Sequence, residues 1–364
     1  MGMKNVLILS HTGACSQFKI GSHHYANKLS LLGYNVYYSG VPISLLHKIL
    51  RRKKTGTQKI NDTVNNLSFN SVFPITLKKN PINKIVNNLY WTFNKEMKEI
   101  PFFDYVICDY PYFYPLLSFI KYNKLVYRPT DDYYSMSGGK VTYYEKRIIE
   151  KAESIVCTSE VVKENLLKRH SNVINENIYV IENGYDAEFF YIKNKMKRNG
   201  CVYIGALDDR FSFDSLNYFA EQFPDISFDI YGPFEKKDRN VIESSKRKNI
   251  SFKGALEYEY VADILNKYKI GILPLVKNGK NKGRSPMKLW EYYSCGLSVV
   301  YSNINHIDND LFFRYESESK ENMYQVFLRA LNYEQEYTKD NALLLKNSWD
   351  FKTKELINIM DCIR

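Results

Sequence analysis

The chain has 364 residues, more than one hydrophobic core usually organises, so its length predicts two domains and excludes a small binding module. With 45% hydrophobic and 25% charged residues, the composition is that of a globular protein and not of a disordered one. The formal net charge of +11 predicts an anionic partner, and charge alone leaves nucleic acid, a membrane surface and a phosphorylated small molecule open.

The first half of the chain alternates apolar strands with helical segments. Residues 6–9 form a short apolar run typical of a buried parallel strand, and a helical pattern over 23–32 ends at Gly33. Further strands are expected at 35–38, 105–108, 125–127, 154–158 and 178–181. This repeated strand–helix–strand order predicts a doubly wound α/β domain.

A second alternating series begins at Cys201. Strands are expected at 202–204, 227–231, 250–252, 270–273 and 298–301, and helices at 213–222, 260–266 and 286–294. The predicted architecture is α/β with two Rossmann-like domains in tandem. The expected parts are a first domain over 1–185, a polar linker over 186–200, a second domain over 201–345 and a C-terminal helix over 346–364 that can return to the first domain.

Residues 283–296 are the most informative segment. We expect Ser285 to cap a helix whose free amides and dipole attract a phosphate, with Arg284 and Lys288 adding positive charge. Lys288 and Glu291 are three residues apart and so share one face of the helix. On that face Lys288 can contact a diphosphate, and the carboxylate of Glu291, one turn further along, can accept hydrogen bonds from ribose hydroxyls. An ordinary capped helix with a surface Lys–Glu pair would show the same residues.

This segment, P-x-K-x-x-E-Y followed by C-G and an apolar strand, resembles the donor-nucleotide helix of GT-B glycosyltransferases. Four more segments resemble parts of that fold in the same order. Residues 18–26 resemble the first loop and helix of the xanthan-type glucuronosyltransferases (the GumK family), 180–186 the interdomain NGxD segment, 203–211 the first strand and loop of the C-terminal domain, and 271–275 the strand before the donor helix. The resemblance, from about residue 3 to 305, implies a GT-B fold with two domains facing across a cleft.

The resemblance also implies which residues bind the donor. In the glucuronosyltransferase family a Met-Lys pair takes part in donor recognition, which corresponds to Met287 and Lys288. Retaining enzymes of this fold usually carry a second glutamate eight residues before the helix glutamate, where this chain has Gly283, so an inverting reaction is favoured. The donor-binding candidates are Gly205, Arg210, Arg284, Ser285, Met287, Lys288 and Glu291.

Asp131 and Asp132 are the candidates for the catalytic base, because they follow the predicted strand at 125–127 at the sheet edge where ligands bind. Neighbouring side chains point to different sides, so one aspartate would take the acceptor proton while the other caps or positions the loop. A plain polar turn is the alternative. The resemblance implies an aspartate base in the N-terminal domain without deciding between the two.

Lys19, His23 and His24 are the acceptor-binding candidates. Adjacent helical residues point about 100° apart, so at most one of the two histidines faces a cleft, and a packing or capping role is the alternative. The glycines of this loop do not form GxGxxG, so no dinucleotide cofactor is expected. No DxD sequence lies on a suitable loop, so no metal is expected either.

Two basic and aromatic segments, residues 45–54 and 82–93, suit docking on an anionic membrane, with solvated loops as the alternative. Nucleic acid is disfavoured because no recognised binding module accompanies the charge. The apolar run at the N-terminus is too short for a signal peptide, no stretch reaches the roughly 20 apolar residues that span a bilayer, and the six cysteines stand singly as in reduced proteins. We therefore expect a cytoplasmic protein at the inner face of the plasma membrane.

These inferences predict a metal-independent, inverting glycosyltransferase of bacterial surface polysaccharide synthesis. The donor would be a UDP-sugar, with glucuronic acid as the sugar implied by the resemblance, and the acceptor a lipid-linked or polysaccharide molecule. The alternatives are another hexose donor, a GT-B-type epimerase and a non-catalytic sugar-nucleotide-binding protein.

Overall fold

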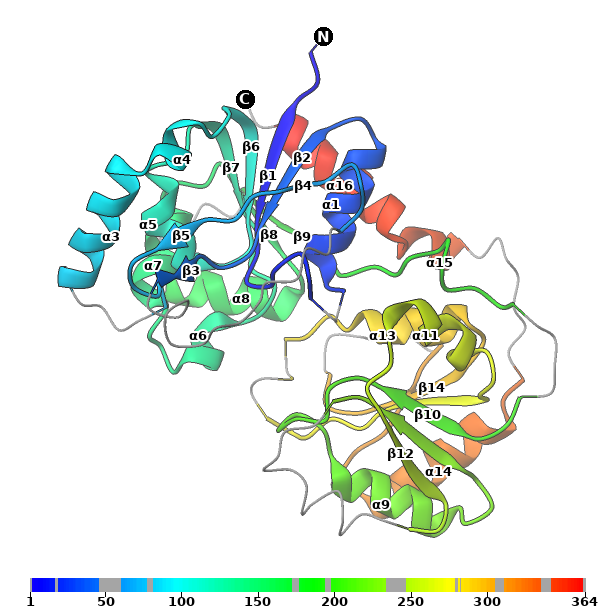
Figure 1. The fold of residues 1–364 in the computed structure, drawn as a ribbon. Helices are drawn as coiled ribbons and strands as arrows, with labels where there is room; N and C mark the ends of the chain where they lie inside the picture. Colours follow the sequence, from blue (N-terminus) through cyan, green and yellow to red (C-terminus); the bar gives the residue numbers. More distant parts are fainter. Residues whose placement is uncertain are drawn as a thin grey trace. The chain divides into compact units, whose positions relative to one another are not determined.

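The computed structural model describes residues 2–16, 19–45, 60–76, 81–171, 177–193, 198–233, 247–278, 281, 283–304, 311–334 and 342–362. The chain divides into two compact units (Figure 1). The first comprises Met1–Glu182 together with Trp349–Arg364, and the second comprises Asn183–Ser348. Each unit is built on its own parallel sheet.

The described residues of the first unit form a seven-stranded parallel sheet in the order β4-β2-β1-β6-β7-β8-β9. Its strands are β1 (Asn5–Leu9), β2 (Asn35–Ser39), β4 (Asn65–Asn66), β6 (Phe103–Cys108), β7 (Tyr122–Tyr127), β8 (Ser154–Cys157) and β9 (Ile178–Val180), beside a separate pair, β3 (Ile43–Ser44) and β5 (Asn70–Ser71). The chain builds outward from β1 in both directions. The switch point, where ligands bind in sheets of this kind, therefore lies between the carboxyl ends of β1 and β6.

Strand β1 shows why this sheet is covered on both faces. Leu7 and Leu9 point into one core, which also contains Phe113 and Ile148, while the alternate residues Val6 and Ile8 are buried on the opposite face. The helices are α1 (Gly21–Leu31), α3 (Pro81–Phe93), α4 (Lys95–Lys98), α5 (Tyr114–Leu117), α6 (Tyr133–Ser137), α7 (Thr142–Ile149), α8 (Glu160–Arg169) and α16 (Trp349–Cys362), with a 3₁₀ turn at Pro111–Phe113. Helix α16 packs on α1, across the sheet from α5 and α7 (Figure 1).

In the second unit, the described residues form a six-stranded parallel sheet in the order β12-β11-β10-β13-β14-β15. Helices α9 and α14 lie together on one face, and α11 and α13 lie on the other (Figure 1). The elements are β10 (Cys201–Ile204), α9 (Phe213–Gln222), β11 (Phe228–Tyr231), β12 (Ile250–Gly254), α11 (Tyr258–Leu265), β13 (Ile270–Leu273), α13 (Met287–Ser294), β14 (Ser298–Tyr301), β15 (Phe313–Arg314), α14 (Lys320–Asn332) and α15 (Ala342–Lys346). Here the switch point lies between β10 and β13.

The expected pair of doubly wound α/β units is confirmed, and α9, β13 and β14 begin and end at the predicted residues. The expected boundary after residue 185 and the expected linker over 186–200 are corrected where the structure describes them, because the second unit begins at Asn183. Tyr185, expected in the first domain, and Phe190, expected in the linker, are both buried in the core of the second unit, where their aromatic rings are removed from solvent. Among the described residues, no helix is both long and apolar enough to cross a membrane.

Candidate functional site

The loop after β10 meets the first turn of α13 at the switch point of the second unit. Gly205 follows β10 directly, and the side chain of Lys288, the second residue of α13, passes over it. A Cβ atom at position 205 would lie 2.9 Å from Lys288 Cε and 2.7 Å from the hydroxyl of Tyr203. Glycine at this position therefore makes room for the lysine.

The start of α13 differs from the prediction. Its N-cap is Pro286, and no side chain caps the helix. The backbone N–H of Asn183 donates to Ser285 Oγ at 2.9 Å, and Asn183 Nδ2 donates to the carbonyl oxygen of Ser285 at 2.8 Å. The predicted cap by Ser285 is wrong because Asn183 occupies its hydroxyl. The first amides of α13 thus receive no cap from any described side chain, which suits them to an anion.

Positive charge gathers around this helix start. Burial lowers the pKa of Lys288 to about 8, and the nearby guanidinium groups of Arg284 and Arg210 lower it in the same direction. Asp208 holds Arg210 with a forked ion pair, in which Arg210 Nε lies 2.9 Å from Oδ1 and 3.1 Å from Oδ2. Three cations therefore converge on one end of α13, where an anionic ligand would relieve their mutual repulsion.

Glu291 lies one turn further along α13 and is buried. Burial raises the pKa of its carboxyl to about 7, with Lys288 opposing the rise and Asp186 adding to it. Burial and the carboxylates of Glu291 and Asp186 also raise the pKa of Tyr258. Asp186 was absent from the predicted set, although it ends the Asn183–Asp186 segment that the resemblance singled out.

Lys288 and Glu291 share a further property. Among the described residues, no ion pair or hydrogen bond engages the ammonium of Lys288 or the carboxylate of Glu291. Lys288 is half-buried and Glu291 is buried, so both charged groups can take a polar ligand as a partner. Five of the seven predicted donor residues thus come together, Ser285 is occupied by Asn183, and Met287 is the half-buried first residue of α13.

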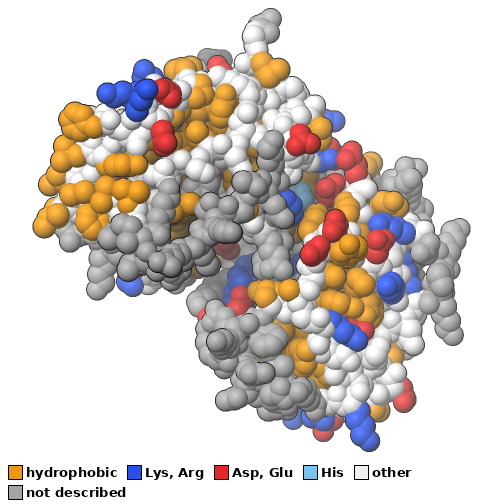
Figure 2. Space-filling view, viewed as in Figure 1, with side chains coloured by type: hydrophobic (Ala, Val, Ile, Leu, Met, Phe, Trp, Pro, Cys, Tyr) orange, Lys and Arg blue, Asp and Glu red, His pale blue; other side chains and the backbone are white. Residues whose placement is uncertain are grey.

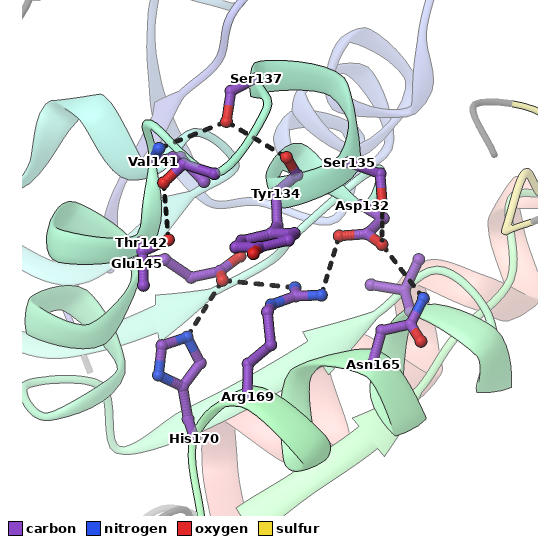
Figure 3. Close-up of polar contacts among 12 residues, drawn as sticks. Asp132, Tyr134, Ser135, Ser137, Val141, Thr142, Glu145, Asn165, Arg169 and His170 are labelled. Carbon is purple, nitrogen blue, oxygen red and sulfur yellow. Dashed lines mark hydrogen bonds and ion pairs between the residues drawn. The ribbon is translucent and has the colours of Figure 1, made fainter.

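In the first unit, the loop after β7 separates the two predicted aspartates. Asp132 is held by three side chains: Arg169 Nη1 lies 3.1 Å from Oδ1, and Asn165 Nδ2 and Ser135 Oγ donate to Oδ2 at 3.0 and 2.8 Å (Figure 3). These contacts suit Asp132 to the loop-positioning role in the predicted pair. Asp131, half-buried beside it, remains the candidate base.

His11, which the sequence interpretation passed over, lies near Asp131. It follows β1 at the switch point, and its Nδ1 is 3.3 Å from the hydroxyl of Tyr133. Although part of the ring reaches solvent, desolvation lowers the pKa of His11, while Asp109 and Asp131 oppose that shift. The imidazole is thus neutral near pH 7 and able to accept a proton.

A buried ion pair lies below these residues at the ends of β6 and β7. Arg128 Nη1 is 3.1 Å from Asp109 Oδ2, and both side chains are almost completely buried. Ser22 also donates to Asp109, and the Arg128 guanidinium lies over the ring of Tyr25 at 4.7 Å. The pair ties α1 to two strand ends, which gives the edge of the sheet a fixed shape.

The structure gives the predicted acceptor residues His23 and His24 the alternative roles, capping for His23 and packing for His24. Nδ1 of His23 accepts from the backbone of Ile20 at 3.1 Å and Nε2 lies 3.0 Å from the carbonyl oxygen of Gly13, so both ring nitrogens are used. His24 is buried and stacks on Trp349 of α16, with ring centroids 5.1 Å apart. Lys19 is half-buried before α1, and desolvation lowers its pKa.

Within the described parts of the chain, no three His, Cys, Asp or Glu side chains are grouped as a metal site. The basic and apolar segment predicted at residues 45–54 lies, from residue 46 on, outside the described residues.

Residues 198–329 match the family model of glycosyl transferases group 1. The chain is also similar to the putative teichuronic acid biosynthesis glycosyltransferase TuaH of Bacillus subtilis (strain 168). These two sequences are 28% identical over 170 residues, which span 44% of this chain and 43% of that protein. The match thus covers less than half of the curated relative.

Solved structures resemble the chain over nearly its whole length. A glycosyltransferase from Rickettsia africae ESF-5 superposes with a TM-score of 0.68 at 15% identity, covering 100% of this chain and 99% of that one. HepE of Anabaena, solved with UDP and glucose, has a TM-score of 0.68 at 10% identity, covering 99% and 100%. A UDP-forming α,α-trehalose-phosphate synthase from Burkholderia xenovorans has a TM-score of 0.69 at 10% identity, covering 98% and 100%. The chain therefore has the GT-B fold, and its residues 198–329 match the glycosyl transferases of group 1.

Proposed function

We propose that the protein is a glycosyltransferase that moves a sugar from a UDP-sugar to an acceptor in polysaccharide synthesis. The observation that carries this proposal is the uncapped start of α13 with Lys288, Arg284 and Arg210 around it. Amides and cations at one helix end suit a diphosphate. The match of residues 198–329 to glycosyl transferases, and the UDP bound in HepE of the same fold, support UDP-sugar as the donor.

In this proposal Lys288 and the α13 amides stabilise the negative charge that grows on the departing UDP. Asp208 holds Arg210, which acts electrostatically on Lys288, through the forked ion pair. Glu291 accepts hydrogen bonds from the ribose hydroxyls, which would give its buried carboxylate the partners that the described residues lack.

The acceptor hydroxyl loses its proton to Asp131 as its oxygen bonds to the anomeric carbon of the sugar. The bond between that carbon and the diphosphate breaks, and UDP leaves with the electron pair. A single displacement of this kind inverts the anomeric configuration. Gly283 is buried and brings no carboxylate to the position that retaining enzymes use, which supports inversion. No metal is required, because the cations and helix amides supply the positive charge.

Glucuronic acid is the donor sugar that the resemblance at Met287 and Lys288 favours. The name of the Bacillus relative, which refers to teichuronic acid biosynthesis, supports a role in a polysaccharide of the cell surface. The acceptor would be lipid-linked or the growing polysaccharide itself. Glucose, galactose and mannose-type donors are the alternatives to be tested beside it.

Helix α3 supports membrane attachment at the inner face of the plasma membrane. Its inward face is fixed by Asn87, which accepts from the backbone of Val72 and Phe73, and by the buried Trp91. Its outward face carries four apolar side chains, spaced three or four residues apart and between 53% and 75% exposed. These are Ile82, Ile85, Leu89 and Phe93. Figure 2 shows hydrophobic side chains gathered over this helix.

The lysines beside this apolar face favour an anionic lipid surface as the partner. Lys84 lies on α3, and Lys95 and Lys98 are exposed on α4 directly after it, where Glu96 is also exposed and Lys95 pairs with Glu99 at 3.9 Å. An apolar helical stripe bordered by lysines is the pattern of a helix that lies in a membrane interface. Each lysine near anionic lipid contributes about 1 kcal/mol of attraction.

A thermal-shift panel of UDP- and GDP-sugars tests the donor site. UDP and at least one UDP-sugar should raise the melting temperature of the wild type, and Lys288→Ala should lose most of that rise. Lys277→Ala is the matched control, because Lys277 is an exposed lysine of the same unit that pairs with Glu318 at 2.6 Å. Equal stabilisation of wild type and Lys288→Ala would remove the proposed site, and no stabilisation by any UDP-sugar would remove UDP as donor.

The reaction is tested by UDP release from the stabilising donor with and without a membrane extract as acceptor source. Release that requires the extract supports transfer. Interconversion of the UDP-sugar without an acceptor would instead indicate an epimerase, and binding without turnover would indicate a non-catalytic protein. Heparin retention that survives excess UDP, with no thermal shift, would point to nucleic acid.

A further inference from the structure

Helix α8 presents two polar side chains to the carboxylate of Asp132. The helix begins after Ser159, whose hydroxyl accepts from the backbone N–H of Val162. Asn165 and Arg169 lie four residues apart and therefore share a face. Asn165 holds Oδ2 of Asp132 at 3.0 Å and Arg169 holds Oδ1 at 3.1 Å (Figure 3). Both oxygens of a carboxylate that is only 10% exposed are thus gripped from one helix.

Arg169 has a second carboxylate partner. Its Nη2 lies 3.3 Å from Glu145 Oε2, and Glu145 on α7 is fully buried. His170 Nε2 lies 3.1 Å from the same oxygen (Figure 3). Tyr127, the last residue of β7, donates its hydroxyl to Oε1 of Glu145 at 3.4 Å. Arg169 therefore links the loop after β7 to α7 and to the end of β7 itself.

This link bears directly on Asp131. Consecutive Cα atoms are about 3.8 Å apart, so a tether on Asp132 restricts the peptide that carries Asp131. Within the same segment, the backbone N–H of Tyr133 donates to the carbonyl oxygen of Asp131 at 2.9 Å. Removal of the Arg169 guanidinium would take away the ion pair on Asp132 Oδ1, leaving Asn165 and Ser135 on Oδ2, and would leave Glu145 without its arginine partner.

We propose that Arg169 is a positioning residue for sugar transfer, which acts through Asp132 to hold the backbone of Asp131. The proposal rests on the proposed function, in which Asp131 accepts the acceptor proton. Arg169 touches no reacting atom, so its loss should slow the proton-transfer step and leave the donor site in the second unit unchanged.

The test uses Arg169→Met, Arg169→Lys, Asp132→Asn and the double variant Arg169→Met/Asp132→Asn in the full chain. Arg169→Met and Asp132→Asn each remove the ion pair. In each of them kcat should fall at least tenfold while KM for the UDP-sugar stays within twofold of the wild-type value. Arg169→Lys should recover part of kcat, because an ammonium can reach one of the two carboxylates. The double variant should be no slower than the worse single variant, because both changes break one link.

Asp350→Asn is the matched control. It makes the same chemical change in the same unit and breaks the 2.9 Å ion pair between Lys28 and Asp350, away from the β7 loop. Its kcat should equal that of the wild type. A kcat of Arg169→Met equal to that of Asp350→Asn, or additive losses in the double variant, would overturn the proposal.

Hydrogen exchange separates failure of this proposal from failure of the proposed function. Peptides that cover residues 128–137 should exchange at least tenfold faster in Arg169→Met than in wild type, and peptides over 21–31 should not change. This readout needs no turnover, so it holds even if no donor or acceptor is found. Unchanged exchange of the loop in folded Arg169→Met and Arg169→Lys would overturn the proposal by itself.

Discussion

The side chain of Lys288 passes over Gly205 so closely that any Cβ atom at position 205 would press on its Cε at 2.9 Å. Gly205→Ala should therefore displace the lysine from the start of α13 without disturbing the helix, and UDP affinity should fall about tenfold, the loss of roughly one charged contact. Isothermal titration with UDP measures the effect. In a Lys288→Ala background the same glycine change should cost less than twofold, and a full tenfold loss there would show that Gly205 acts by another route.

The pH dependence of UDP binding should follow Lys288. Its pKa is about 8 in the free protein, and a bound diphosphate favours the charged form, which raises that pKa in the complex. Above pH 8 the binding step must then take up a proton, so affinity should fall by up to tenfold per pH unit until the raised pKa is reached. Below pH 8 the lysine is already charged and contributes no slope.

Two variants check that assignment by titration from pH 7 to 9.5. Lys288→Arg stays charged throughout and should abolish the slope. Glu291→Gln removes a carboxylate that raises the pKa of Lys288, so the loss of affinity should begin below pH 8. The same slope in wild type and Lys288→Arg would assign the titration to another group.

The base is tested by Asp131→Asn and His11→Ala, assayed separately for turnover and for UDP binding. Loss of a general base typically slows a reaction by about 10²- to 10⁴-fold, and UDP affinity should not change because the donor site belongs to the other unit. If Asp131 is the base, His11→Ala should cost much less than Asp131→Asn. The reverse order would make the neutral imidazole of His11 the proton acceptor.

Local patterns predicted the strands of three or more residues and the helices α1, α9, α11, α13 and α16, because apolar runs and helical spacing depend on neighbours in sequence. They did not predict α3, α7, α8 or α14, nor the two-residue strands β3, β4, β5 and β15. The prediction for Ser285 failed because its hydroxyl is taken by Asn183, which is distant in sequence. Likewise, His23 and His24 carry no local sign of burial, since His24 is covered by Trp349 from a helix near the end of the chain.

The choice between Asp131 and Asp132 could not be made from the sequence, because it depends on Asn165 and Arg169 of α8. His11 could have been found. It directly follows the first buried strand, and once β1 is placed at the centre of the sheet, a polar residue at its carboxyl end lies at the switch point.

The first unit should become less stable in acid because of His24. Its pKa is lowered to about 3 by burial, so between pH 6.5 and about 3 the unfolded chain binds a proton that the folded chain does not. The free energy of unfolding contributed by this site is fully present above pH 6.5 and falls by about 1.4 kcal/mol per pH unit below it. His24→Phe keeps a ring against Trp349 but cannot be protonated. Between pH 7 and 5, its free energy of unfolding in urea should therefore fall less steeply with falling pH than that of wild type, by about 1.4 kcal/mol per pH unit below pH 6.5. Parallel curves for the two proteins would contradict it.

Membrane attachment should depend on the outward face of α3. Ile85→Glu/Phe93→Glu places two carboxylates in the exposed apolar stripe, where burial in lipid would become unfavourable while the inward residues Asn87 and Trp91 are unchanged. Cosedimentation with vesicles that contain 30% anionic lipid should fall at least tenfold relative to wild type, and wild-type binding should weaken as salt is raised, because lysines share in the attraction.

Leu31→Glu/Leu32→Glu is the control for this experiment, since these leucines are also at least half exposed in the same unit but lie at the end of α1. The control should sediment like wild type. Equal losses in both variants would mean that added negative charge, and not the α3 face, weakens binding. If wild type binds neutral vesicles as well as anionic ones, only the apolar stripe anchors the protein and the lysines do not contribute to binding. Turnover of a soluble acceptor should be unaffected in either variant, because neither variant changes a residue proposed to bind the donor or to take the acceptor proton.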